Sequence, residues 1–96
     1  MAQIIKTTGE VIEVAPKNGH DFSLEEMQEI VNHNGNHYIE VIYLPNNKLM
    51  IINEEGKCNH VKAPFNQKAT DIFVEAFGPY DFVCGNVLVC DTNQVE

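Results

Sequence analysis

The sequence predicts one α+β domain over residues 1–96, with a mainly antiparallel sheet of about five or six strands and two helices. Three observations lead to this prediction. Two segments place apolar residues at helical spacing, and the other apolar residues fall in short β-rich runs joined by tight turns. A chain of 96 residues is also too short for two independent hydrophobic cores. We expect the order ββαββαβ(β), in which the last strand forms if the final run divides, and both helices on the same side of the sheet.

Four β-rich runs predict two hairpins. Residues 3–7 and 10–14 form the first pair, and the Thr-Gly sequence at 8–9 permits the tight reversal between them. Residues 38–44 and 48–53 form the second pair, which a Pro-Asn-Asn sequence connects. We expect the second pair to supply the central strands of the sheet.

The start of the first helix is marked by several signals close together. Ser23 is placed to act as the N-cap, and Glu26, three residues later, completes a capping box. Phe22 and Met27 stand at the two positions of a hydrophobic staple. Asn and Gly residues at 32–35 provide the stop signal. The apolar face of this helix consists of Leu24, Met27, Ile30 and Val31.

The second helix follows a turn and a short extended piece. The turn covers residues 54–57, where Gly56 is free to take a positive φ, and the extended piece ends at Pro64. The helix begins near Asn66, and Gly-Pro at 78–79 terminates it. Its apolar stripe consists of Ala69, Ile72, Phe73, Ala76 and Phe77.

The end of the chain allows two interpretations. Residues 82–84 and 87–90 are both β-rich, and Gly-Asn at 85–86 lies between them. This dipeptide either turns a tight hairpin or bulges one longer strand, and both alternatives stay open. Residues 91–96 are polar, so we expect a frayed tail.

The charge and cysteine content limit the classes of partner. The chain has 14 acidic and 6 basic residues and a net charge of -8, which disfavours binding to a nucleic-acid backbone. No apolar run approaches the ~20 residues of a membrane span, and the first residues do not resemble a leader, so we expect a cytoplasmic protein. Cys58, Cys84 and Cys90 form an odd set, which is typical of reduced thiols in or near a core.

We expect neither a complete enzyme active site nor a metal or cofactor site. The spacings Cys58-x-His60 and Cys84-x5-Cys90 differ from the paired spacing of zinc sites, and no phosphate-binding glycine loop occurs. Cys58 beside Lys57 is the one candidate nucleophile. A small hydrolase using Cys58, or the carboxylates of Glu40, Glu54 and Glu55, is therefore a third-ranked hypothesis.

A polar cluster is the best candidate for binding. It joins the turn at 53–57 to the N-terminus of the second helix, whose free N–H groups and positive dipole end suit a phosphate or carboxylate. In this hypothesis lysine side chains pair with the phosphates of the ligand, asparagine side chains form hydrogen bonds with its polar edges, and an aromatic ring stacks on its base. The candidate ligand-binding residues are Tyr38, Asn53, Glu54, Lys57, Phe65, Asn66 and Lys68. The alternative is that Asn66 is a plain N-cap and 53–57 a plain turn.

The same residues carry a family resemblance. Its elements are Tyr38-Ile39-Glu40-Val41, Asn53-Glu54-Glu55-Gly56-Lys57, Asn66 with Ala69-Thr70, and Asp81-Phe82-Val83-Cys84-Gly85-Asn86-Val87-Leu88-Val89. In this order and spacing, from about residue 22 to 90, the chain resembles a family of short uncharacterised domains found mainly in bacteriophages, plasmids and their bacterial hosts. The resemblance implies a setting and no activity, and the Cys58-Asn59-His60 piece departs from the pattern.

Two functional hypotheses follow. The first is a non-enzymatic accessory protein of a phage or mobile element that blunts a host defence by sequestering a small nucleotide-derived immune signal, with a homo-oligomer completing the pocket. The second is an acidic inhibitor that docks on a basic patch of a host defence enzyme. Neither the ligand, the protein partner nor the stoichiometry follows from the sequence.

Overall fold

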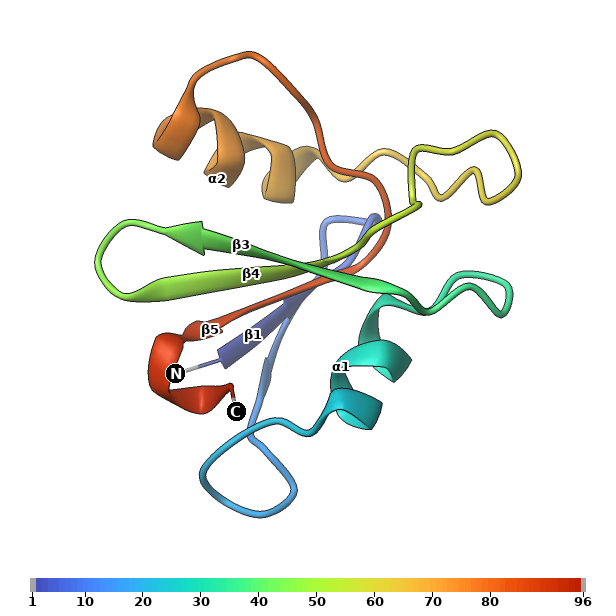
Figure 1. The fold of residues 1–96 in the computed structure, drawn as a ribbon. Coiled ribbons are helices and arrows are strands. Elements are labelled where there is room, and N and C mark those ends of the chain that lie inside the picture. Colours follow the sequence, from blue (N-terminus) through green and yellow to red (C-terminus); the bar gives the residue numbers. More distant parts are fainter. Residues whose placement is uncertain (1, 96) are drawn as a thin grey trace.

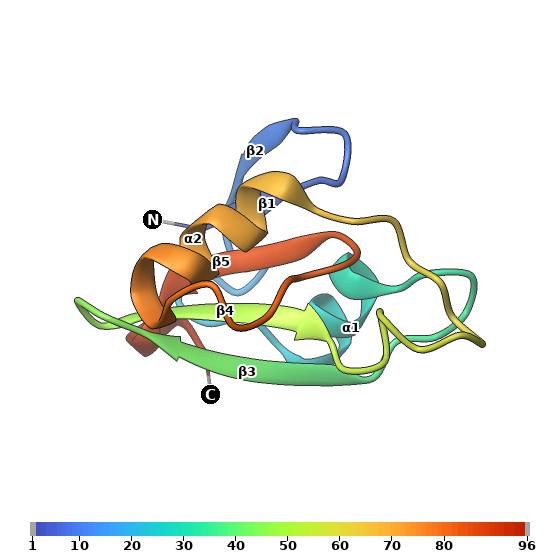
Figure 2. The same ribbon diagram turned by 90° about the horizontal axis from the view of Figure 1, so that it is seen from above.

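The structure, a computed structural model that describes residues 2–95, contains a five-stranded antiparallel sheet with the strand order β2-β1-β5-β4-β3 (Figures 1 and 2). The α+β class and the order ββαββαβ are confirmed. The elements are β1 (Ala2–Ile5), β2 (Val11–Val14), α1 (Leu24–Val31), β3 (Ile39–Leu44), β4 (Lys48–Asn53), α2 (Gln67–Phe77), β5 (Val87–Asp91) and the 3-10 helix η1 (Thr92–Gln94).

The prediction that the second hairpin supplies both central strands is wrong for β3. The last strand, β5, enters between the two hairpins and pairs with β1 on one side and β4 on the other. Consequently β4 lies inside the sheet, whereas β3 forms one edge and β2 the other. Figure 2 shows β3 along the outer side of the sheet.

The two helices lie on opposite faces of the sheet, which corrects the expectation that they share one side (Figure 1). The cause is visible in the alternation of β4. Leu49 and Ile51 point into a core with Met27 of α1, while Met50 points into a second core with Ala69 of α2. A strand that is apolar at consecutive positions is typical of burial on both faces.

Helix α1 begins as predicted. The Ser23 side chain accepts a hydrogen bond from the Glu26 N–H at 3.1 Å, and the Glu26 carboxylate accepts one from the Ser23 N–H at 2.8 Å. Phe22 and Met27 are both buried in the same core, as the staple requires. Leu24, predicted on the apolar face, is instead exposed.

Three details of the loops differ from expectation. Gly56 does not have a positive φ; a Cβ there would stand 2.8 Å from the Cys84 backbone oxygen, so close approach explains this glycine. Gly85, at φ 91°, forms neither a hairpin nor a bulge, because residues 82–84 do not pair with β5. The tail is ordered as far as Val95, which pairs with Phe22 and packs against the α1-side core.

Candidate functional site

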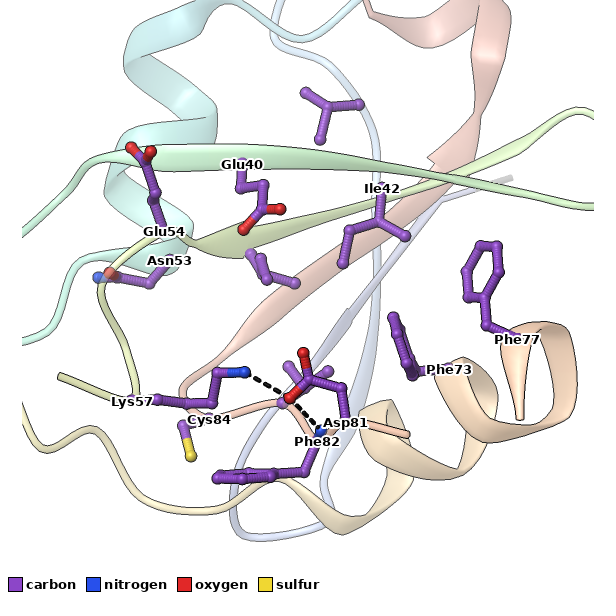
Figure 3. A pocket seen from close by; sticks show the side chains of 13 residues that line it. Glu40, Ile42, Asn53, Glu54, Lys57, Phe73, Phe77, Asp81, Phe82 and Cys84 are labelled. Atoms are coloured by element: carbon purple, nitrogen blue, oxygen red, sulfur yellow. Dashed lines mark hydrogen bonds and ion pairs between the residues drawn. The ribbon is translucent and has the colours of Figure 1, made fainter. Parts of the chain in front are cut away.

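A cleft of about 380 Å³ lies between α2 and the β3–β4 hairpin (Figure 3). Its floor is apolar and includes Ile42 of β3 and Ile52 of β4. Phe73 and Phe77 of α2 form one wall, with their ring centroids 5.0 Å apart. Because Phe77 keeps 43% of its surface exposed, α2 covers this face of the sheet only in part.

The position of α2 explains why the cleft stays open. At its first turn α2 is anchored by Asn66, and Ala69 and Thr70 are the buried residues of the helix. The Thr70 hydroxyl accepts a hydrogen bond from the Val83 N–H at 2.9 Å, which ties the helix to the chain that returns from it. The aromatic C-terminal half of α2 therefore overhangs β3 without closing on it.

An ion pair closes one end of the cleft. Lys57 Nζ lies 2.5 Å from the Asp81 carboxylate and 4.9 Å from the centroid of the Phe82 ring. The hydrogen bond from Lys57, followed by one from the Phe82 N–H, lowers the pKa of Asp81 below its ordinary value. Lys57 is thus held by a carboxylate and an aromatic face from the loop that follows α2 (Figure 3).

The charged rim of the cleft is predominantly acidic. Glu40, Glu54 and Asp81 are its carboxylates, and Lys57 is its one ammonium group among the lining residues that the structure describes. Glu40 extends from β3 over the cleft, whereas the Glu54 carboxylate points away from the ion pair (Figure 3). With a net chain charge of -8, this rim attracts cations and repels free anions.

The two predicted asparagine ligands are committed to the protein's own backbone. Asn53 is buried, and its amide donates to the carbonyls of Val31 and Asn36 and accepts from the Glu55 N–H. Asn66, at 0% exposure, donates to two carbonyls and accepts from a helix N–H. Neither amide has a polar atom left for a ligand, so we replace the predicted ligand contacts with structural roles.

The other predicted site residues are only partly brought together. Asn53, Glu54 and Lys57 line the cleft, whereas four other residues do not. Those four are Tyr38, Phe65, Asn66 and Lys68. Tyr38 stacks on His37 at 5.7 Å, and the exposed Lys68 follows the helix cap. Phe65 reaches the site only indirectly, through its ring contact with Phe82 at 6.2 Å.

The groups considered for catalysis do not converge. Glu40 and Glu54 line the cleft, but the Glu55 carboxylate accepts a hydrogen bond from the Asn36 side chain, which lowers its pKa. Cys58 is exposed, unlike the predicted near-core thiol, while Cys84 and Cys90 are buried as expected. Burial raises the pKa of both buried thiols, that of Cys90 to about 11.

Residues 2–95 contain neither a cluster of metal ligands nor a membrane-spanning helix. Within residues 2–95, no three His, Cys, Asp or Glu side chains cluster closely enough to hold a metal ion. In the same range, no helix has the length and hydropathy required to cross a membrane.

Sequence reasoning missed the residues that shape the cleft. Phe73 and Phe77 were assigned to a core stripe, because helical spacing alone does not tell a covered face from a half-covered one. Asp81 and Phe82 follow the Gly-Pro terminator of α2, and the sequence placed both in the family pattern and Phe82 in a β-rich run, but neither at the binding site. A carboxylate residue followed by an aromatic residue, just after the helix stop at Gly78-Pro79, was the one sequence signal that could have indicated this part of the site.

The fold and the cleft define a small α+β domain with an acidic, aromatic-walled binding cleft. The chain belongs to the family described as "Domain of unknown function (DUF3846)", whose model matches residues 2–96. This confirms the resemblance to an uncharacterised family. The comparisons with curated proteins and with solved structures each gave no match.

Proposed function

We propose that this domain is a non-enzymatic binding protein that holds a basic, partly apolar segment of a protein partner in the cleft between α2 and the β3–β4 hairpin. The observation that carries the proposal is the composition of the cleft: aromatic walls that remain exposed, surrounded by three carboxylates and one lysine. Exposed aromatic side chains in a concave site are typical of binding surfaces. The acidic rim favours lysine and arginine side chains and speeds their association.

The setting of this binding is part of the proposal. The family resemblance supports a phage or mobile-element protein that works in the cytoplasm of a bacterial host and blunts a defence enzyme by docking on it. Binding alone is sufficient for such an inhibitor. The expected homo-oligomer stays a prediction, and the cleft is lined by residues of a single chain.

A second candidate, capture of a small nucleotide-derived immune signal, is favoured by one observation. The Phe82 ring lies beside the Lys57 ammonium and contacts the Phe65 ring, so this end of the cleft offers a stacking surface and a cation. The volume of the cleft also lies at the lower end of the range for small-ligand sites. Against it, Lys57 is already paired with Asp81, and the other rim charges repel phosphate.

Paired variants test the leading proposal. Phe77→Ser removes an aromatic wall of the cleft, and Tyr80→Ser removes an aromatic ring that is 86% exposed outside it. In a pull-down from bacterial host lysate at low salt, we expect the native chain and the Tyr80→Ser variant to retain a host protein. We expect the Phe77→Ser variant not to retain it. Equal retention by all three chains contradicts the proposal. Native mass spectrometry of the freshly purified chain tests the second candidate, since a retained adduct of nucleotide mass would favour it.

A further inference from the structure

Strand β3 presents a free row of backbone groups at the edge of the sheet. The Glu54 N–H donates to the Tyr38 carbonyl at 2.9 Å, which makes these two residues a hydrogen-bonded pair at the base of the β3–β4 ladder. In an antiparallel ladder such pairs alternate along the strands. The backbone groups of Glu40, Ile42 and Leu44 therefore face β4. Those of Ile39, Val41 and Tyr43 face outward, away from the sheet.

The side chains on the α2 face of β3 line the hollows beside that edge. Glu40 and Ile42 line the cleft, and Leu44 lines a second hollow of about 470 Å³ on the other flank of α2. A strand added to β3 would place its residues opposite Glu40 and Ile42 on this same face, because paired residues in a ladder share a face. Its side chains would then enter the cleft from the open side.

The edge of β3 lacks most of the features that usually block strand addition. Natural edge strands are protected by lysine, proline, bulges, short length or inward-pointing charged side chains. Of these β3 has one, the Glu40 carboxylate on the cleft side, which repels an acidic strand and attracts a basic one. Ile39–Leu44 has six residues without proline, glycine or lysine, and it pairs with β4 without a bulge. The opposite edge, β2, has only four residues, Val11–Val14. Within residues 2–95, no hydrogen bond to the outward groups of Ile39, Val41 and Tyr43 is present.

We propose that an extended, basic segment of a partner protein adds to β3 as a sixth strand, with a lysine or arginine opposite Glu40 and an apolar residue opposite Ile42. The basic side chain meets the carboxylates of the rim, and the apolar one meets the ring of Phe73. At the β3 edge, charge complementarity favours this occupant over a second copy of the chain, because the acidic rim attracts a basic segment and repels a chain with a net charge of -8. The proposal rests on the proposed function and specifies its partner and mode of binding.

A designed peptide tests this mode on the full chain. The probe is an eight-residue peptide of about strand length, Thr-Lys-Thr-Val-Thr-Lys-Thr-Val, which alternates lysine and valine along one face. Its control carries glutamate in place of lysine. We expect the lysine peptide to shift the NMR amide signals of Ile39, Val41 and Tyr43, and the glutamate peptide to bind at least about tenfold more weakly.

Matched backbone variants identify the edge that is used. Val41→Pro removes an outward N–H of β3. Glu13→Pro removes an outward N–H of β2, because the hydrogen bond from the Lys6 N–H to the Glu10 carbonyl shows which residues of β2 face β1 and which face outward. We expect Val41→Pro to abolish binding and Glu13→Pro to preserve it. Glu40→Lys leaves the backbone intact and should reverse the preference between the two peptides, so it answers the question even if Val41→Pro does not fold.

The outcomes separate this inference from the proposed function. If Phe77→Ser weakens peptide binding while the β3 amides stay unshifted and Val41→Pro binds normally, the cleft proposal stands and strand addition is wrong. If Phe77→Ser, Val41→Pro and Glu40→Lys all leave peptide binding unchanged, both proposals are wrong. If sedimentation equilibrium shows a dimer that Val41→Pro dissociates, the occupant of the β3 edge is a second copy of the chain and the proposal of a basic partner is wrong.

Discussion

Asn66 should contribute far more to stability than an ordinary helix cap. Its side chain makes three hydrogen bonds at 0% exposure: it accepts from the Ala69 N–H at 3.0 Å and donates to the carbonyls of Ile5 at 3.0 Å and Gly85 at 2.9 Å. One side chain thus joins the start of α2 to the end of β1 and to the loop before β5.

The cost of Asn66→Ala can be worked from these three bonds. Loss of the cap costs about 1 kcal/mol. The Gly85 carbonyl, left buried without a donor, costs about 1–3 kcal/mol. The Ile5 carbonyl also faces Val87 in the β1–β5 ladder, so it loses a second hydrogen bond worth about 1 kcal/mol. We therefore expect the free energy of unfolding to fall by about 3–5 kcal/mol, a large part of the ~5–15 kcal/mol typical of a whole domain.

Asn66→Asp distinguishes this account from simple capping. Aspartate caps helices as well as asparagine does, so a plain N-cap would tolerate the change. Here it removes both donors and places a carboxylate against the two carbonyls of Ile5 and Gly85, so we expect it to cost at least as much as Asn66→Ala. Ser23→Ala, at the exposed cap of α1, is the control and should cost about 1 kcal/mol.

Urea unfolding followed by circular dichroism measures all three variants. The reasoning is refuted if Asn66→Asp is as stable as the native chain, or if Asn66→Ala costs no more than Ser23→Ala. Either result would mean that the fold does not need the buried amide. The hypothesis that Asn66 binds a ligand would then be open again.

Three further predictions follow from the loops and from β5. Gly56→Ala should destabilise the chain by about 2 kcal/mol in the same urea assay, because its Cβ meets the Cys84 carbonyl oxygen at 2.8 Å. Cys90 should resist alkylation at neutral pH until the chain unfolds, since burial raises its pKa to about 11; rapid labelling in mass spectrometry would contradict this. The hydrogen bond from Lys48 lowers the pKa of Asp91 from 3.8 to about 2. The contribution of this ion pair to stability is therefore present above pH 3.8 and is lost as the pH falls towards 2. Lys48→Met should return the pKa of Asp91, measured by NMR titration, towards 3.8.

The local elements were predictable from the sequence, because their signals are local. The capping box at Ser23 and Glu26, the stop at Gly78 and the Pro-Asn-Asn turn each depend on residues a few positions apart. The sheet order was not predictable in the same way. It depends on where β5 inserts, which no short-range pattern specifies, and that insertion moves β3 to the edge.

The site was harder to predict for a related reason. Asn53 and Asn66 look identical in sequence to exposed polar residues of turns and caps, and only the fold shows that their partners include Val31 and Ile5, far away in the chain. Conversely, Phe77 looks like a core residue by spacing. Burial is a property of packing between distant segments, so the polar residues were over-assigned to binding and the aromatic ones under-assigned.

The unequal coverage of the two sheet faces explains why binding is expected on the α2 side. On the α1 face, Phe22, Met27 and Val31 are all buried, and the helix closes its core. On the other face, α2 buries Ala69 and Thr70, while Phe77 remains partly exposed. Covering such an aromatic side chain would stabilise the domain by roughly 1–2 kcal/mol at about 25 cal/mol per Å². That free energy remains available to a partner, and the open edge of β3 is the side from which an extended segment can reach it.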